Sequence, residues 1–218
     1  LAEAALTAYD ADSFFEAYSN AIKRLAPRAK HYDTRENPGI SIKLSALHPR
    51  YEVSQKDRVM RELVPRVFDL ALLAMEAQMG LNIDAEEADR LDLSLDVIEA
   101  VLRSPKFAGW NGFGVVVQAY SKRAAAVIDW LYELARELDR TIMVRLVKGA
   151  YWDTEIKQAQ VDGMRDFPVF TDKAATDVSY ICCAKKLLDY SDRLYPQFAT
   201  HNAHTVCAIL NMFGHNQS

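Results

Sequence analysis

The stretch TIMVRLVKGAYW, residues 141–152, decides how the chain is interpreted. Its first seven residues form an apolar run that predicts a buried strand over 141–147. Arg145 and Lys148 carry charge near the end of this strand, Gly149 follows, and Tyr151 and Trp152 are aromatic. A buried strand that ends in charged residues and a glycine is typical of α/β folds, in which functional residues gather at the carboxyl ends of the strands.

The same pattern, a strand followed by a helix, recurs on both sides of this stretch. Further strands are predicted over residues 40–44, 80–84, 113–119 and 195–200. Helices are predicted over residues 11–26, 56–78, 91–103, 122–138, 172–189 and 204–213. Strands that alternate with helices indicate a parallel sheet. Residues 151–170 interrupt the alternation, and we expect an inserted element with a short helix that covers a ligand.

Two features favour a closed (β/α)8 barrel of the TIM type over an open doubly wound sheet. No glycine-rich dinucleotide motif follows the first strand. Each strand ends in polar or charged residues, and the carboxyl-terminal face of a barrel is where active sites form. These residues are Lys43, Asp84, Gln118, Arg145 and Thr200.

The length of the chain sets how much of such a barrel is present. A complete barrel takes about 250 residues, whereas these 218 residues supply five βα units. We therefore expect a fragment that lacks roughly three units beyond residue 218. Residues 1–38 are expected to form an N-terminal helical segment that leads into a partial barrel over residues 39–218.

The composition excludes several other classes of protein. Half of the residues are hydrophobic, and the formal net charge of -4 gives no electrostatic reason to bind nucleic acid through this segment. No run of about 18 apolar residues predicts a transmembrane helix. Three cysteines do not make a disulfide framework, so an intracellular, cytoplasmic location is expected.

The polar strand ends leave several hypotheses open. Asp84, Glu86, His201 and His204 are of the residue types that bind divalent metals, which would suit a metal-dependent barrel hydrolase or aldolase. However, the spacing of the Cys and His residues is not that of a zinc site, and acidic residues are also favoured at the start of a helix. Lys43 and Asp84 are expected to form an ion pair. A third hypothesis is a non-catalytic barrel remnant that serves as a folding or interaction module.

Several motifs, taken together and in order, resemble the proline dehydrogenase family in its bifunctional form. These motifs are SIKLSALHPR (41–50), NIDAEE (82–87), QAY (118–120), RLVKGAYW (145–152) and FATHNAH (198–204). The resemblance covers nearly the whole chain. It implies an FAD-dependent barrel that oxidises L-proline to pyrroline-5-carboxylate by hydride transfer to the flavin N5 atom, with electrons passed to a quinone.

The resemblance also implies roles for individual residues. Lys43, Asp84 and Tyr151 resemble the family's substrate-binding residues, and Asp84 and Arg145 resemble its catalytic ones. Contacts with FAD are implied for Gln118, Arg145, Val147, Lys148, Gly149, Trp152, Thr171, Thr200, His201 and Asn202, and no metal is implied.

Further partners follow from the same resemblance. It implies a fused aldehyde dehydrogenase domain, a homo-oligomer and peripheral contact with the inner membrane. The family's arginine pair that grips the proline carboxylate has no counterpart in residues 1–218. Glu3 resembles the partner of one of those arginines. We therefore expect this fragment alone to be inactive.

Overall fold

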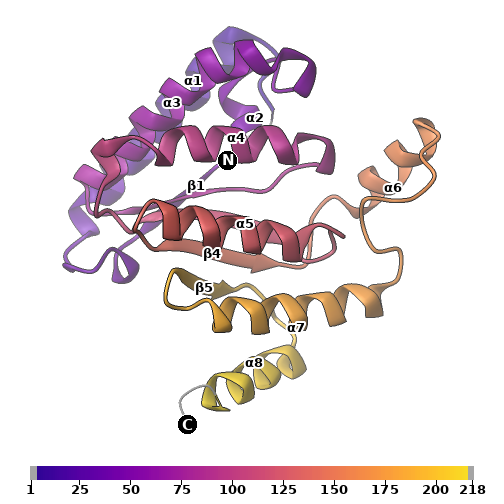
Figure 1. Ribbon diagram of the computed structural model, residues 1–218. Helices are drawn as coiled ribbons and strands as arrows, with labels where there is room; N and C mark the ends of the chain where they lie inside the picture. Colours follow the sequence, from indigo (N-terminus) through magenta and orange to yellow (C-terminus); the bar gives the residue numbers. More distant parts are fainter. Residues whose placement is uncertain (1–3, 216–218) are drawn as a thin grey trace. The chain divides into compact units, whose positions relative to one another are not determined.

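The computed structural model describes residues 4–215, so Glu3 lies outside the described part of the chain. Within it, five parallel strands form one sheet in the order β1-β2-β3-β4-β5 (Figure 1). The strands are β1 (Gly39–Ile42), β2 (Gly80–Ile83), β3 (Phe113–Gln118), β4 (Ile142–Val147) and β5 (Leu194–Phe198). This arrangement confirms the predicted α/β class and all five predicted strands.

Helices separate successive strands, as the sequence predicted. They are α1 (Ala8–Leu25), α2 (Leu44–Leu47), α3 (Lys56–Glu76), α4 (Leu91–Leu102), α5 (Ala124–Glu137), α6 (Trp152–Val161), α7 (Lys173–Asp189) and α8 (Ala203–His215). Helix α6 is the predicted short helix of the insertion, and Figure 1 shows it projecting from the rest of its unit. The short helix α2 was not predicted. The first strand ends at Ile42 rather than at residue 44, because the chain turns into α2 immediately after Lys43.

The described chain forms two compact units, with the boundary between Val115 and Val116 inside β3. The core of the first unit is built on α3, which buries an apolar stripe with the three- and four-residue spacing of a helix. The members of this stripe are Val59, Leu63, Val67, Leu70, Ala71 and Ala74. Leu81 and Ile83 of β2 are also buried, as is the aromatic group of Phe107, Trp110 and Phe113.

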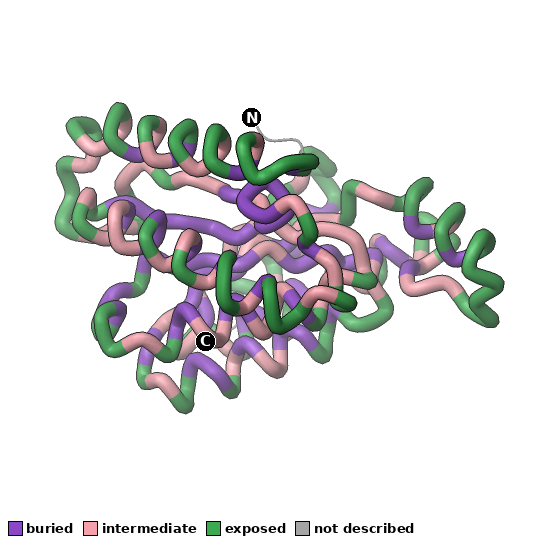
Figure 2. Tube along the Cα trace, turned by 90° about the horizontal axis from the view of Figure 1, so that it is seen from above, coloured by how far each residue is buried: buried purple, intermediate pink, exposed green. Residues whose placement is uncertain are grey.

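The second unit shows the two-residue alternation of a strand covered on one side by helices. Ile142, Val144 and Leu146 of β4 are fully buried, and α7 packs against both β4 and β5. Arg145 points to the opposite face, where it is partly exposed. Figure 2 shows that burial concentrates along the strands, while the longer helices alternate between buried and exposed residues. Packing against the helices therefore fixes which face of β4 carries the charged side chain.

The imidazole of His48, which follows α2, is buried and takes part in two hydrogen bonds. Its Nδ1 accepts the backbone N–H of Arg50 at 3.1 Å, and its Nε2 lies 3.1 Å from Oε2 of Glu62. Because Nδ1 is an acceptor, this arrangement suits a neutral ring that donates from Nε2. Burial lowers the pKa of His48 below its ordinary value, although Glu62 opposes the shift.

We expect His48 to make the first unit less stable in mild acid. The unfolded chain takes up the proton at a higher pH than the folded chain does, so the contribution of His48 is complete above about pH 6.5. It declines as the pH falls from that value toward the lowered pKa. Denaturant unfolding at pH 8 and pH 5.5 checks this, with His48→Gln as the comparison. Equal losses of stability in the two proteins would contradict the assignment.

Candidate functional site

The carboxyl ends of β1 and β2 bring two predicted site residues together in the first unit. The register pairs Ile42 with Ile83, so Lys43 and Asp84 follow at neighbouring positions. Their side chains form an ion pair, with Nζ of Lys43 3.7 Å from Oδ2 of Asp84, and each is about 30% exposed. The backbone N–H of Asp84 also donates to the carbonyl of Ile42 at 2.9 Å. The pair that the sequence predicted is thus present and accessible to a ligand.

The turn after β1 is held by Tyr18, which the sequence did not single out, and by Glu86, which it singled out for other roles. Oη of Tyr18, on α1, accepts the backbone N–H of Lys43 at 3.2 Å. Oε1 of Glu86 accepts the N–H of Ser45 at 3.0 Å, and the carbonyl of Ser45 accepts the N–H of Ala5 at 2.9 Å. Glu86 therefore acts on a neighbouring loop, a role distinct from the two considered for it, helix start and metal ligand.

In the second unit, hydrogen bonding continues past the ends of the strands. The N–H groups of Ala119 and Tyr120 donate to the carbonyls of Val147 and Lys148 at 2.8 and 2.7 Å. Oε1 of Gln118, a buried side chain, accepts the N–H of Ala150 at 3.1 Å. Gln118 thus shapes the turn after β4, where the predicted cofactor contacts are concentrated.

Gly149 adopts a backbone conformation that side chains rarely take, with φ of +143°. A Cβ atom there would lie 2.4–2.6 Å from three atoms of the Tyr120 ring, which is itself buried. The resemblance implies a contact with FAD for this glycine. In the structure the space that a side chain would fill is occupied by Tyr120, so packing alone requires a glycine.

Two cations of this unit differ in their surroundings. Lys148 forms an ion pair with Asp177 of α7, and Lys173 pairs with the same carboxylate. These two lysines, Lys148 foremost, hold the pKa of Asp177 below its ordinary value. Arg145 lies on the face of β4 opposite Ile142, Val144 and Leu146, and the register places it beside Gln197 of β5. Oε1 of Gln197 is buried and has no hydrogen-bond partner among residues 4–215.

The insertion is fixed at both of its ends. Nε1 of Trp152 donates to the carbonyl of Phe170 at 2.9 Å, and the N–H of Phe170 donates to the carbonyl of Tyr120 at 2.8 Å. The Trp152 ring is still 42% exposed, so a planar ligand could stack on it. Thr171, the next predicted contact, is exposed, and Tyr151 is partly buried.

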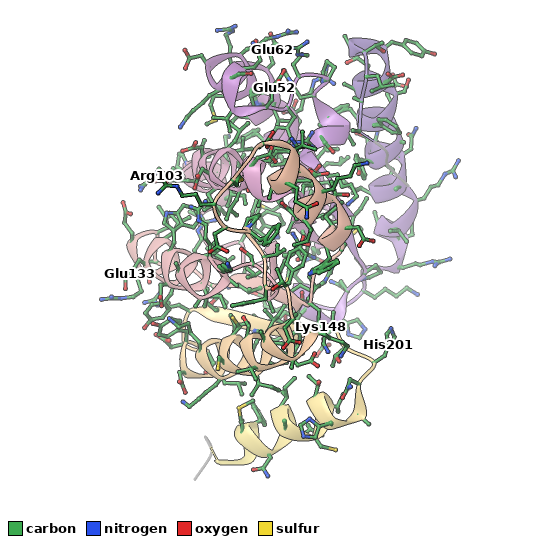
Figure 3. All side chains as sticks on the ribbon, turned by 90° about the vertical axis from the view of Figure 1, so that its right-hand side faces the viewer. Glu52, Glu62, Arg103, Glu133, Lys148 and His201 are labelled. Atoms are coloured by element: carbon green, nitrogen blue, oxygen red, sulfur yellow. The ribbon has the colours of Figure 1, made fainter. Side chains whose placement is uncertain are left out.

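Thr200, His201 and Asn202 lie directly before α8. Oγ1 of Thr200 accepts the N–H of Asn202, and Oδ1 of Asn202 accepts the N–H of Thr205, both at 3.1 Å. The remaining N–H groups at the start of α8 are of the kind that binds phosphate. His201 is exposed, and Figure 3 shows it and Lys148 on the side that faces the viewer.

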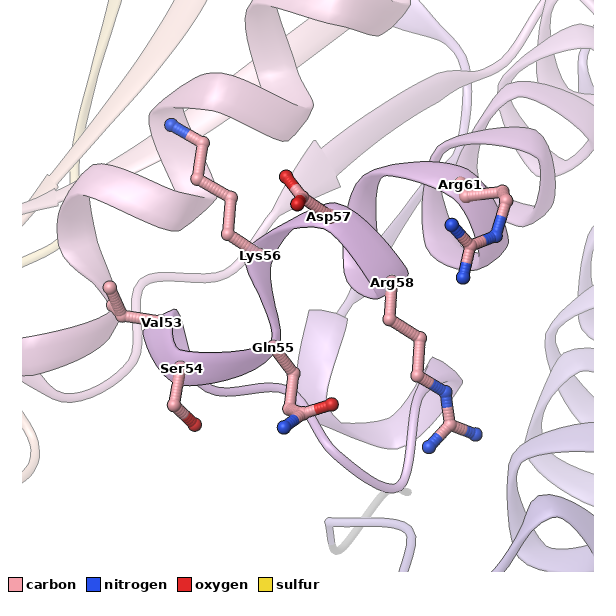
Figure 4. A pocket seen from close by; sticks show the side chains of 7 residues that line it. All are labelled: Val53, Ser54, Gln55, Lys56, Asp57, Arg58 and Arg61. Carbon is pink, nitrogen blue, oxygen red and sulfur yellow. The ribbon is translucent and has the colours of Figure 1, made fainter.

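Two other candidate sites gain little support. Within residues 4–215 no group of three or more His, Cys, Asp or Glu side chains is arranged to hold a metal ion. A shallow pocket of about 370 Å³ lies at the start of α3 (Figure 4). Two of its cations are already paired, Lys56 with Asp96 and Arg58 with Glu62. None of the predicted site residues lines it.

The parallel sheet and the helices that follow its strands define an α/β protein of the barrel type. The chain belongs to the proline dehydrogenase family, whose model matches residues 1–218. It is 56% identical over 216 residues to the bifunctional protein PutA of Salmonella typhimurium, covering 99% of this chain and 16% of that relative.

Solved structures agree with this assignment. A crystal structure of a point mutant of Bradyrhizobium japonicum proline utilization A (PutA) matches with a TM-score of 0.97 at 56% identity, covering 98% of this chain and 22% of that one. PutA from Bdellovibrio bacteriovorus, inactivated by N-propargylglycine, matches at 0.92 with 31% identity over 100% of this chain and 24% of that one. The barrel-type fold is thereby confirmed, and the chain spans under a quarter of these relatives.

Proposed function

We propose that this chain is part of an FAD-dependent proline dehydrogenase that oxidises L-proline to pyrroline-5-carboxylate, the first step of proline degradation to glutamate. Electrons would then pass to a quinone. The observation that carries the proposal is the accessible Lys43–Asp84 pair at the ends of β1 and β2, in a chain that matches the proline dehydrogenase family throughout.

The chemistry of the second unit fits a flavin. Arg145 supplies a cation on the same face of the sheet as Gln197, whose buried amide oxygen has no hydrogen-bond partner among residues 4–215. The start of α8 offers N–H groups to a phosphate, and Trp152 offers an exposed ring to an aromatic base. Gln118, Val147, Lys148, Gly149, Thr171, Thr200, His201 and Asn202 are proposed as the remaining contacts.

FAD, when bound, supplies a two-electron acceptor for the hydride that leaves the ring carbon next to the proline nitrogen. The protein's part is to bind and orient. Nζ of Lys43 would hold the substrate carboxylate, and Asp84 would fix the position of that ammonium group. Tyr151 is proposed as a further contact with the substrate. Arg145 would stabilise negative charge that develops as electrons arrive.

The context of the whole protein is also proposed. The relatives' name, bifunctional protein, supports a fused second enzyme, which we propose is an aldehyde dehydrogenase domain. On the resemblance to the family, we propose a cytoplasmic homo-oligomer with peripheral contact to the inner membrane. No helix within residues 4–215 is long and apolar enough to cross a membrane. Residues 1–38 are proposed to lead into a partial barrel over 39–218.

The full-length protein should be yellow, with the absorbance of bound flavin, and should reduce a quinone when proline is added. N-propargylglycine, which inactivates the Bdellovibrio protein, is expected to inactivate it in a time-dependent way that excess proline slows. Activity that survives removal of flavin but is lost to a metal chelator would instead support the metal-dependent hypothesis. Full-length protein without flavin or proline oxidation would rule the proposal out.

A further inference from the structure

Tyr18 connects the N-terminal helix α1 to the first residue after β1. Its side chain is buried, with 7% of the residue exposed, and its oxygen accepts the backbone N–H of Lys43 at 3.2 Å. This N–H lies between the last residue of β1 and the first residue of α2. The phenol thus ties the backbone of Lys43 to α1.

The surroundings of this phenol are those of the predicted substrate site. Burial raises the pKa of Tyr18 above its ordinary value, and the charges of Asp84 and Glu86 raise it further, whereas Lys43 opposes the shift. Tyr18 therefore keeps its proton at neutral pH. A neutral phenol accepts the N–H of Lys43 and still has a hydrogen to donate.

The rest of the turn after β1 is likewise held by hydrogen bonds between its backbone and groups outside β1. Glu86 holds the N–H of Ser45, and Ala5 donates to its carbonyl. Residues 43–45 are thus fixed by three groups from outside β1, two of which belong to the N-terminal segment. The side chain of Lys43 is a flexible four-carbon stem that does not fix its own direction. The backbone bonds at residues 43–45 therefore set the direction in which this side chain leaves the sheet.

We propose that Tyr18 is a positioning residue for Lys43: its hydroxyl fixes the backbone from which the lysine reaches Asp84 and the substrate carboxylate. The inference rests on the proposed function and adds α1 to the residues that prepare the substrate site. Tyr18 contacts neither substrate nor cofactor in this scheme and acts through Lys43.

The test is Tyr18→Phe in the full-length protein, which keeps the ring and removes the oxygen. Loss of one hydrogen bond is expected to raise the KM for proline about fivefold, with a smaller change in kcat and an unchanged flavin spectrum. Tyr190→Phe is the matched control, since it removes a hydroxyl that bonds Asp129 at 2.8 Å between α5 and α7. The control should leave KM unaltered.

A double-mutant cycle separates positioning from a general effect on the fold. In a Lys43→Met background Tyr18→Phe should change KM no further, because the side chain that it positions is gone. An unchanged KM in the Tyr18→Phe variant would overturn the inference. So would an increase in KM by the same factor in the wild-type and Lys43→Met backgrounds. The inference would also be overturned if a lower thermal unfolding midpoint of Tyr18→Phe by itself accounted for the rise in KM. If the wild-type protein does not oxidise proline, the proposed function fails instead.

Discussion

Substitution of Gly149 by alanine is expected to release the flavin and to lower the free energy of unfolding by about 2–5 kcal/mol, since it combines backbone strain with overpacking. The residue has φ of +143°, and its new Cβ would overlap the ring of Tyr120. Tyr120 cannot readily retreat, because its N–H and its carbonyl are both hydrogen bonded, to Lys148 and Phe170. Flavin absorbance during denaturant unfolding of the full-length protein measures both effects.

Gly163→Ala is the control for this substitution. Gly163 also has a positive φ, +63°, but a Cβ atom there has no neighbour within 4 Å. It should cost only the backbone strain, about 1 kcal/mol, and keep the flavin. Equal behaviour of the two variants would show that the contact with Tyr120 contributes nothing.

Replacement of Lys43 by methionine is expected to reduce kcat/KM for proline by about 30- to 160-fold, mostly through KM. This range corresponds to about 2–3 kcal/mol, the value of a hydrogen bond to a charged group. The substitution removes the ammonium group proposed to bind the carboxylate and leaves Asp84 without the partner that lies 3.7 Å away. Steady-state kinetics with proline and a quinone are the measurement.

Lys56→Met provides the comparison, because it also removes a lysine from an ion pair, here with Asp96 at 2.6 Å. Lys56 lies at the start of α3 rather than at a strand end, so kcat/KM should stay within about twofold of wild type, as is usual for surface pairs. If Lys43→Met is equally mild, Lys43 does not bind the substrate.

Much of the fold could be predicted from the sequence, because its signals are local and strong. The run of valines at 115–117 and the apolar positions 142, 144 and 146 indicate strands without knowledge of their partners. Lys43 and Asp84 could be paired in advance, since ends of adjacent parallel strands meet at one edge of the sheet. Short α2 gave no comparable signal, because four mostly apolar residues after a strand are equally compatible with its continuation.

The supporting groups of the site could not be predicted, because they act across the sequence. Tyr18 is 25 residues from Lys43, and in the sequence it is one apolar position among several in a helical pattern. Glu86 lies 41 residues from Ser45 and stands among other acidic residues that suit a helix start. Gly149 was predicted as a site residue, but the structural reason for a glycine there is the ring of Tyr120, which follows β3 rather than β4.

The hydrogen bonds at the base of the insertion have a consequence for how this region can change in length. Trp152, Phe170 and Tyr120 join the two ends of residues 152–170 at one place, and Ser121 forms a β-bridge with Val169. The contacts at the base offset the entropy lost in bringing the two ends of this loop together. That entropy loss grows only slowly with the number of residues between the two ends. Deletions or additions beyond the base can alter the insertion while the turn after β4 keeps its shape, which makes this segment suited to exchange among related enzymes.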